Sequence, residues 1–512
     1  MIDHIYWKIV QNHEKRAQNV QKRHFKSFLF FYYLFCYGKL LSCNGGKTSM
    51  ITKKLAIFVL NETLATGADF AEIYIQEKND RNIVLSNRRV DTLSQNLIFG
   101  IGIRLFKGKK SVYGYTSDMT KSSLIKLARK LALSFDGERI VTVEKLTKVH
   151  NPKHHQPKIL HSAMSTEEKL SFMREGEKAM YESSNLIVNA RVGLTEWDEK
   201  VWIYNSKGRF VTDTRCHTRF VMVSTASRGG EFQIGFFKKS DSKGLELFNE
   251  FDIKKQAYTI SQEAVEMLDA PECPSGKMTV IIDNGFGGVI FHEACGHPLE
   301  GNSISHNTSV FAGKLGEKIA SSIVSAVDDG TIENGWGSSN FDDEGEKTTK
   351  NVLIKNGVLT NYMMDNFEGR RMGRKSTGAC RRESYKFVPT TRMTNTYICN
   401  GKSSKEDIIK NTKYGLYVVA LNGGSVNPTT DKFNFTASKA YIVKDGEILH
   451  LVKDAAIVGY GYEILKNIDM VGNNLAFGDG MCGASSGMIP ANVGQPTMRV
   501  QNLTVGGRGG NL

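Results

Sequence analysis

The sequence predicts an α+β protein of two domains, an N-terminal α+β domain and a β-rich C-terminal domain that bears a short H-E-x-x-x-H helix. The chain has 512 residues, more than one hydrophobic core usually serves. Its composition is globular, with 40% apolar and 23% charged residues. Helical and strand patterns alternate as far as residue 270, and glycine-punctuated strand patterns dominate beyond it. We therefore expect domains at 50–270 and 271–512.

Residues 1–49 stand apart from both domains. They hold eight Lys or Arg against two acidic residues, and the ten apolar residues 28–37 are too few to span a bilayer as a helix. The segment fits an upstream read-through extension or a targeting segment, with LLSC at Cys43 loosely similar to a lipid-attachment site. Because Met50 begins a stretch typical of a soluble domain, we favour the extension. We expect no transmembrane segment.

The spacing of apolar residues predicts the first helices and strands of the N-terminal domain. Helical spacing predicts helices through residue 64 and over 121–135. Between them, apolar runs predict strands at 71–74, 83–85, 98–106 and 111–117. Three histidines (His150, His154 and His155) follow beside two prolines, and we interpret 148–160 as a polar linker rather than a metal site.

The rest of the N-terminal domain begins with a helix signal. Ser165 and Glu168 form a capping-box pattern that opens a helix to about residue 182. Four strand patterns and a long helix over 244–269 follow, and NSKG (205–208) predicts a hairpin turn. The strand patterns lie at 185–194, 200–213, 220–227 and 231–237.

The C-terminal domain begins after PECPSG (271–276). The apolar run at 278–283 predicts a buried strand, and residues 285–297 predict a short helix. The remainder is rich in strand patterns, at 351–364, 390–400, 414–424 and 439–452.

Charge and cysteine content exclude some classes of protein. The net charge of +14 includes about +6 from residues 1–49, and no nucleic-acid-binding module accompanies it, so we do not expect nucleic acid as a partner. The eight cysteines are scattered without a C-x-x-C pattern, which favours reduced thiols in a cytoplasmic protein.

The segment FHEACGHPLE (291–300) carries the strongest chemical signal. His292 and His297 are five residues apart, about 140° around an ideal α-helix, so their rings would point apart. A π-type turn would align them, and Gly296 and Pro298 permit such a distortion. We therefore predict a helix that unwinds or bulges between Cys295 and His297.

A catalytic zinc site needs a third protein ligand beside the two histidines. Cys482 lies in the glycine-rich FGDGMCGASSG, where the backbone can approach a buried centre closely. Cys295 is nearer in sequence, but on a helix it would compete with His297 for the same face. We favour Cys482 over Cys295.

Four segments resemble the TldD/PmbA family of metallopeptidases, over essentially all of residues 50–500. They are HEACGHPLEG, TTRMTNTYI, GGSVNPTTDKFNFTASKAYIVKDGEI and GDGMCGASSGMIPANVGQPTMRV. The longer-spaced H-E-x-x-x-H followed by LEG is typical of the TldD-type, catalytic subunit. Asn302 stands where the family often has Asp, which removes no ligand.

The resemblance implies a function and a ligand set. Zinc would be held by His292, His297 and Cys482, and Glu293 would act as general acid/base on a zinc-bound water. The expected substrates are unfolded or extended peptides. The expected assembly is a homodimer or a heterodimer with a TldE/PmbA-like subunit.

Three alternatives stay open on the sequence. The chain could be a non-catalytic regulatory or peptide-binding subunit, a DNA-associated modulator, or a thiol peptidase using Cys295 or Cys482. Substrate contacts are unknown from the sequence. Arg392 could meet a peptide carboxylate from an edge strand, or be a solvated arginine on a core strand. The basic segment 370–384 could bind an acidic partner, and we favour a solvated loop with local ion pairs.

Overall fold

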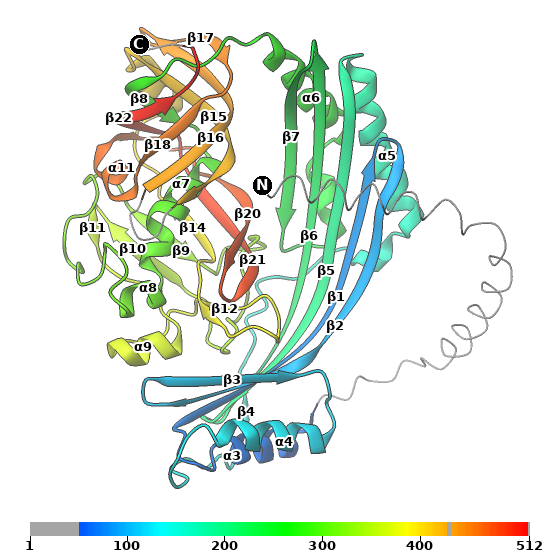
Figure 1. Cartoon of the computed structure of the whole chain (residues 1–512), viewed down its shortest axis with the longest axis vertical. Helices are drawn as coiled ribbons and strands as arrows, with labels where there is room; N and C mark the ends of the chain where they lie inside the picture. The colour runs from blue at the N-terminus through cyan, green and yellow to red at the C-terminus, as the bar shows by residue number, and fades with distance from the viewer. Residues whose placement is uncertain (1–50, 427–431, 510–512) are drawn as a thin grey trace, which may run out of the picture. The chain divides into compact units, whose positions relative to one another are not determined.

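A sheet of long, mostly antiparallel strands forms the first half of the chain (Figure 1). The computed structural model describes residues 51–426 and 432–509, so the predictions for residues 1–49 lie outside the described residues. The strand order is β3-β2-β1-β5-β6-β4, and β7 pairs with β6. The strands are β1 (Phe70–Ser86), β2 (Arg89–Lys107), β3 (Lys110–Thr116), β4 (Thr147–Lys148), β5 (Ile187–Asn205), β6 (Arg209–Arg228) and β7 (Glu231–Asp241).

Strand β1 is longer than the sequence predicted. The two strands expected at 71–74 and 83–85 are the ends of one continuous strand, paired along its length with β2 on one side and β5 on the other. The polar residues 76–82 therefore have backbone partners on both sides. That pairing keeps the strand intact where side-chain polarity suggested a break.

Four helices accompany this sheet: α3 (Lys53–Thr63), α4 (Lys121–Ala132), α5 (Thr166–Ser183) and α6 (Ile253–Asp269). The capping box of Ser165 and Glu168 is confirmed at the start of α5. The helix predicted over 244–269 is wrong at its start. Leu245–Glu250 is a separate 3₁₀ turn, and the Asp252 side chain accepts from two backbone N–H groups to begin α6.

Two further large sheets follow, together with the two-stranded β12 (Cys380–Arg381) and β13 (Thr390–Thr391). The six-stranded sheet has the order β11-β10-β9-β14-β21-β20, so β20 is an end strand. Its strands are β9 (Ala326–Asp329), β10 (Lys350–Lys355), β11 (Val358–Leu359), β14 (Asn395–Ile398), β20 (Ala476–Ala484) and β21 (Gly487–Gln495).

The third sheet has seven strands in the order β15-β8-β22-β18-β16-β17, with β19 on β22. Because β15 also pairs with β16, five strands close into a ring. The strands are β8 (Gly276–Ile282), β15 (Tyr414–Val426), β16 (Lys432–Lys444), β17 (Glu447–Val452), β18 (Ala456–Tyr460), β19 (Ile468–Val471) and β22 (Met498–Gly506). The helices of this region are α7 (Val289–Phe291), α8 (Gly301–Ser305), α9 (Asn366–Met372), α10 (Lys405–Lys410) and α11 (Gly461–Asn467).

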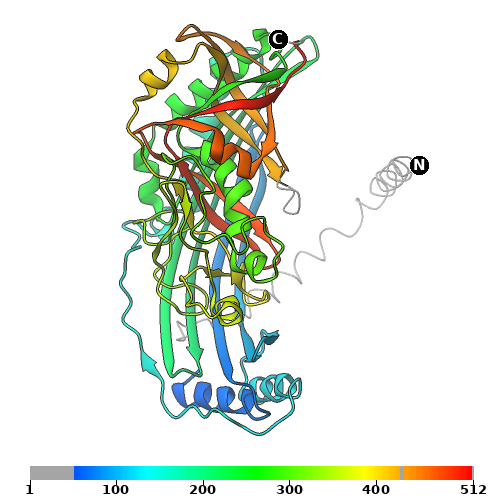
Figure 2. The ribbon, with the colours of Figure 1, turned by 90° about the vertical axis from the view of Figure 1, so that its left-hand side faces the viewer.

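Buried ion pairs join the long sheet to the later elements. Arg104 on β2 pairs with Glu72 on β1 and with Glu344, and Arg382 also reaches Glu72, at 3.2 Å. Figures 1 and 2 show the long strands of the first sheet running beside the later elements of the chain. The described residues from Lys53 onward form one compact unit. The predicted domain boundary near residue 270 stays a prediction.

The predicted linker at 148–160 is irregular after Lys148, the last residue of β4, and most of its residues are exposed, as expected of a polar linker; His155 is the buried exception. The Asn334 N–H donates to His155 Nδ1 at 3.0 Å, and the His154 N–H donates to Asn340. Burial lowers the pKa of His155 to about 4, so this imidazole is neutral at pH 7.

Candidate metal centre

A π-helical turn places the two histidines of the motif side by side. After α7, the turn covers His292–Gly296, and the His297 N–H donates to the His292 carbonyl five residues earlier. The predicted bulge is therefore confirmed. The two imidazole ring centroids lie 5.1 Å apart, on one side of the turn.

Gly296 lets this turn pack closely. A Cβ at this position would lie 2.1 Å from the Met393 Sδ, nearer than real Cβ contacts come. Pro298 then lies in a 3₁₀ turn, His297–Leu299, which ends the helical segment. Small and rigid residues thus set the unusual spacing.

Cys482 reaches the two histidines from β20, far along the chain. Its Sγ lies 3.2 Å from His292 Nε2 and 3.3 Å from His297 Nε2. The buried Arg392 donates to the Cys482 carbonyl at 2.6 Å, which holds this part of the strand in place. All three donor atoms lie within 4.8 Å of one another.

The chemistry of these three donors fits a tetrahedral zinc ion. Ordinary Zn–S and Zn–N lengths at tetrahedral angles put sulfur and nitrogen about 3.6 Å apart. The observed separations of 3.2 and 3.3 Å are within a few tenths of an ångström of that value. Two imidazoles and one thiolate are also ligands that zinc prefers.

The charge state of Cys482 suits a metal ligand. Burial by itself raises the pKa of this thiol, but the charges and hydrogen bonds of His292 and His297 outweigh burial and lower the pKa to about 3. The thiolate is the form that binds metal. Burial opposes protonation of His297, but Glu300 and Cys482 raise its pKa well above the usual value.

Glu300 orients one of the imidazoles. One of its carboxylate oxygens lies 3.2 Å from His297 Nδ1, which directs Nε2 of the same ring toward Cys482. Glu300 is buried, and the Arg392 guanidinium lies 4.0 Å from the same oxygen. The sequence analysis missed this role, although a carboxylate three residues after a histidine is a signal for it.

Glu293 lies beside the ligand cluster, and its carboxylate is partly exposed to solvent. Its side chain is 27% exposed, and its carboxylate lies 3.8 Å from His297 Nε2. Glu293, His292 and Cys482 all line a cavity of about 1040 Å³, with walls from β7, β15 and β20. A substrate in this cavity can therefore meet the carboxylate and the ligand cluster together.

Cys295 lies elsewhere, as the comparison of the two cysteines predicted. It is fully buried on the π turn, and its thiol points to the Gly461 carbonyl at 3.7 Å. It is not a member of the cluster formed by His292, His297 and Cys482.

A second group of potential metal ligands consists of His161, Asp198 and Cys216, but its side chains already bond to neighbours. Both ring nitrogens of His161 already have partners, Asp198 at 3.1 Å and Thr218 at 2.9 Å. Burial and the nearby Asp198 raise the pKa of the Cys216 thiol, so it stays protonated. We interpret this group as a hydrogen-bonded support within the sheet.

Comparison with known sequences identifies the family. Models of the PmbA/TldA metallopeptidase match three parts of the chain: domain 1 at residues 71–134, the central domain at 160–269 and the C-terminal domain at 275–507. A protein named metalloprotease TldD homolog, from Buchnera aphidicola subsp. Acyrthosiphon pisum, is 34% identical over 464 residues, 88% of this chain and 95% of the relative. The chain belongs to the TldD/PmbA family of metallopeptidases.

A second relative and a solved structure of the TldD/PmbA family are also similar to this chain. The metalloprotease TldD homolog of Haemophilus influenzae is 33% identical over 448 residues, 86% of this chain and 93% of that protein. The crystal structure of TldE from Thermococcus kodakarensis shares the mixed α/β fold, with a TM-score of 0.70 and 21% identity over 88% of this chain and 99% of that one. By family, this chain is a metalloprotease, a hydrolase of peptide bonds.

The two hypotheses about Arg392 are both wrong. Arg392 is neither solvated nor placed to meet a peptide end, because it is fully buried and donates to Ser486 Oγ, Gly487 O and Cys482 O. Its neighbour β14 lies inside its sheet, between β9 and β21, so it offers no free edge.

The basic segment 370–384 is only in part the solvated loop with local ion pairs that we favoured: residues 373–375 are exposed and Arg371 pairs with Glu368 at 3.6 Å, but other members are buried. The Arg382 side chain is fully buried, and its ion pair with Glu72 is long-range rather than local. Arg370 pairs with Asp69, another distant residue. Over the described ranges 51–426 and 432–509, no helix is both long and apolar enough to cross a membrane.

Proposed function

We propose that this chain is a zinc-dependent peptidase of the TldD type that hydrolyses unfolded or extended peptides. One observation carries the proposal: His292, His297 and Cys482 converge within 4.8 Å on the wall of a cavity that also exposes Glu293. Three protein ligands are what a catalytic zinc site uses. Zinc, when bound there, would polarise a carbonyl group and lower the pKa of a water molecule.

Glu293 moves the proton in this mechanism. Its carboxylate lies beside the ligand atoms and faces the cavity, so it can take a proton from the attacking water and pass it to the leaving amine. Glu300 holds the His297 ring in one orientation through Nδ1, and Arg392 fixes the Cys482 backbone. These residues preorganise the site before a substrate arrives.

The end strand β20 supports the choice of extended peptides. It carries Cys482, is an end strand of its sheet and lines the cavity from Phe477 to Cys482. A peptide that pairs with this edge would present backbone carbonyls to the site without strict sequence preference. We therefore propose β20, rather than residues 390–398, as the strand that a peptide substrate would pair with.

Assembly and location stay predictions. We expect a homodimer or a heterodimer with a TldE/PmbA-like subunit, in the cytoplasm. A second candidate function, a non-catalytic peptide-binding subunit, differs in one measurable respect, because it would bind peptide without hydrolysis.

Metal removal tests the proposal directly. Dialysis of the full chain against 1,10-phenanthroline should abolish hydrolysis of fluorescently labelled, reduced and alkylated casein, and added zinc should restore it, because the site is a metal centre. Activity that survives metal removal but not thiol alkylation would instead indicate a thiol peptidase. Zinc-loaded protein that binds casein without cleaving it would support the non-catalytic alternative.

Replacement of Glu300 by glutamine tests the orienting contact. We expect Glu300→Gln to weaken zinc binding about 10–100-fold, because His297 loses the carboxylate that fixes its ring. Competition with a chromophoric chelator measures this affinity. The exposed Glu317→Gln is the matched control and should bind zinc as the parent does. Equal affinity in the Glu300 variant would refute the role.

A further inference from the structure

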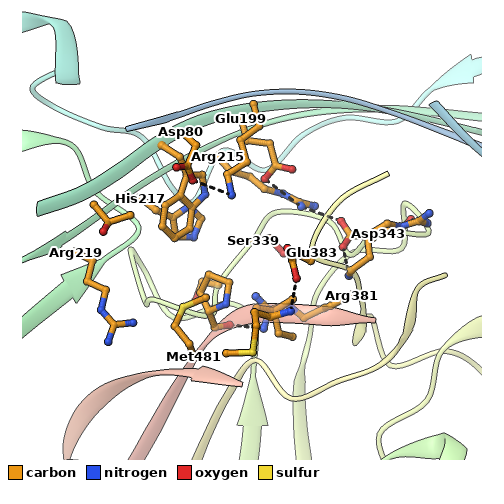
Figure 3. A pocket seen from close by; sticks show the side chains of 18 of the residues that line it. Asp80, Glu199, Arg215, His217, Arg219, Ser339, Asp343, Arg381, Glu383 and Met481 are labelled. Carbon is orange, nitrogen blue, oxygen red and sulfur yellow. Dashed lines mark hydrogen bonds and ion pairs between the residues drawn. The ribbon is translucent and has the colours of Figure 1, made fainter. Parts of the chain in front are cut away.

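A second, smaller cavity adjoins the one that contains the metal centre. It has a volume of about 370 Å³ and lies between the long sheet and the β20–β21 hairpin (Figure 3). Arg219 on β6 and Met481 on β20 line both cavities. Because Met481 immediately precedes Cys482, the small cavity begins within one residue of a proposed zinc ligand. We call it the arginine cavity, after the arginines described below.

Most charges in the arginine cavity are neutralised locally. Arg215 lies 2.8 Å from Asp343 and 3.8 Å from Glu199. Lys78 lies 3.5 Å from Asp80. The charges within each of these pairs offset one another.

Four lining residues have no such ion pair among the described residues: Arg219, Arg381, and the carboxylates of Asp342 and Glu383, which accept from backbone N–H groups. Within the described part of the chain, Arg219 has no carboxylate within 4.0 Å and no hydrogen bond, and Figure 3 shows it directed toward Met481, away from the ion pairs around Arg215. Among the described residues, Arg381 donates to two backbone carbonyls, Met393 O at 2.8 Å and Pro490 O at 2.6 Å. Arg219 therefore keeps a positive charge at the cavity wall without a close carboxylate, whereas Asp343 and Asp328 attract Arg381 from farther away.

Two further groups lie around Arg219. Lys238 is paired with the Asp479 carboxylate, at 3.6 Å. Burial and, to a lesser degree, the Arg219 charge lower the pKa of Lys238, although Asp479 opposes them. His217 adds a buried ring whose Nδ1 has no partner among the described residues. An anion that can also accept hydrogen bonds would satisfy these groups.

We propose that the arginine cavity binds a carboxylate group of the peptide substrate, with Arg219 as its anchor. The inference rests on the proposed peptidase function and adds a substrate class, namely peptides with a carboxylate close to the cleaved bond. Two sources share this chemistry, the C-terminal carboxylate and an acidic side chain. A planar guanidinium can bind either one through two parallel hydrogen bonds.

Peptide affinity measured without turnover tests this inference. The protein is the zinc-loaded full chain with Glu293→Gln, and the probes are three fluorescein-labelled alanine hexapeptides: the free acid, its C-terminal amide, and the amide with one internal glutamate. We expect the free acid to bind about tenfold more tightly than the amide. Adding Arg219→Gln should remove that preference, whereas Arg228→Gln, on the same strand but outside both cavities, should keep it.

The other outcomes of this binding experiment have different meanings. A gain for the glutamate peptide alone, lost with Arg219→Gln, would support the cavity with an acidic side chain as its ligand. Equal affinities for all three peptides, or a preference that survives Arg219→Gln, would overturn the inference and leave the peptidase function intact. Failure of all three peptides to bind would overturn both.

Discussion

Glu293→Gln is expected to keep about one zinc per chain while kcat for peptide hydrolysis falls by about 10²–10⁴-fold. Glutamine has the same shape as glutamate but cannot accept the proton from water. Glu293 is not among the three clustered donors, and its side chain faces the cavity, so its loss should spare the metal. Elemental analysis and a fluorogenic peptide assay on one preparation measure both quantities.

The control for this variant is the same change at an exposed site. Glu406→Gln, in the first turn of α10 and outside the cavity, should leave zinc content and kcat near the parent values. A Glu293 variant that kept most of its rate would exclude this carboxylate as the general base. A variant that lost its zinc would make Glu293 a structural residue.

Cys482→Ser is expected to have the larger effect on the metal itself. In this variant a neutral hydroxyl replaces a thiolate that lies 3.2 and 3.3 Å from the two imidazoles. Loss of a residue that only supports a ligand, such as Glu300, lowers zinc affinity about 10–100-fold, and loss of the ligand itself should lower it further. Zinc per chain, measured after dialysis against metal-free buffer, should drop from about one to a small fraction.

Cys295→Ser is the comparison for that experiment. Its thiol points to Gly461 in the core rather than to the histidines, so this variant should retain zinc. Retention by the Cys482 variant and loss by the Cys295 variant would transfer the ligand role to Cys295. Absence of zinc from the parent protein, after supply of the metal, would support a non-catalytic subunit.

Local sequence signals predicted local structure well. The capping box at Ser165 and Glu168 begins α5, and NSKG (205–208) is the turn between β5 and β6. Both depend on residues within three or four positions of one another. The π turn was also predictable, because the five-residue spacing of His292 and His297, Gly296 and Pro298 all act within one helical segment.

Elements that depend on distant partners were harder to predict. The polar residues 76–82 lie within one unbroken strand only because β2 and β5 pair with it on both sides. Arg392, which sequence alone could only place on a strand, is buried by Ser486 and Gly487 from a hairpin about 90 residues away.

By itself, the sequence determined the family, the two histidines with their distorted spacing, and the choice of Cys482 over Cys295 as third ligand candidate. These follow from motifs and from helix geometry, which act over short distances along the chain. Only the tertiary structure decided that Glu300 orients His297, that Arg392 supports Cys482, and that Arg219 keeps an unpaired charge beside the site. The reason is physical: burial, ion pairing and cavity shape depend on which distant strands come together, and no local pattern of residues records that.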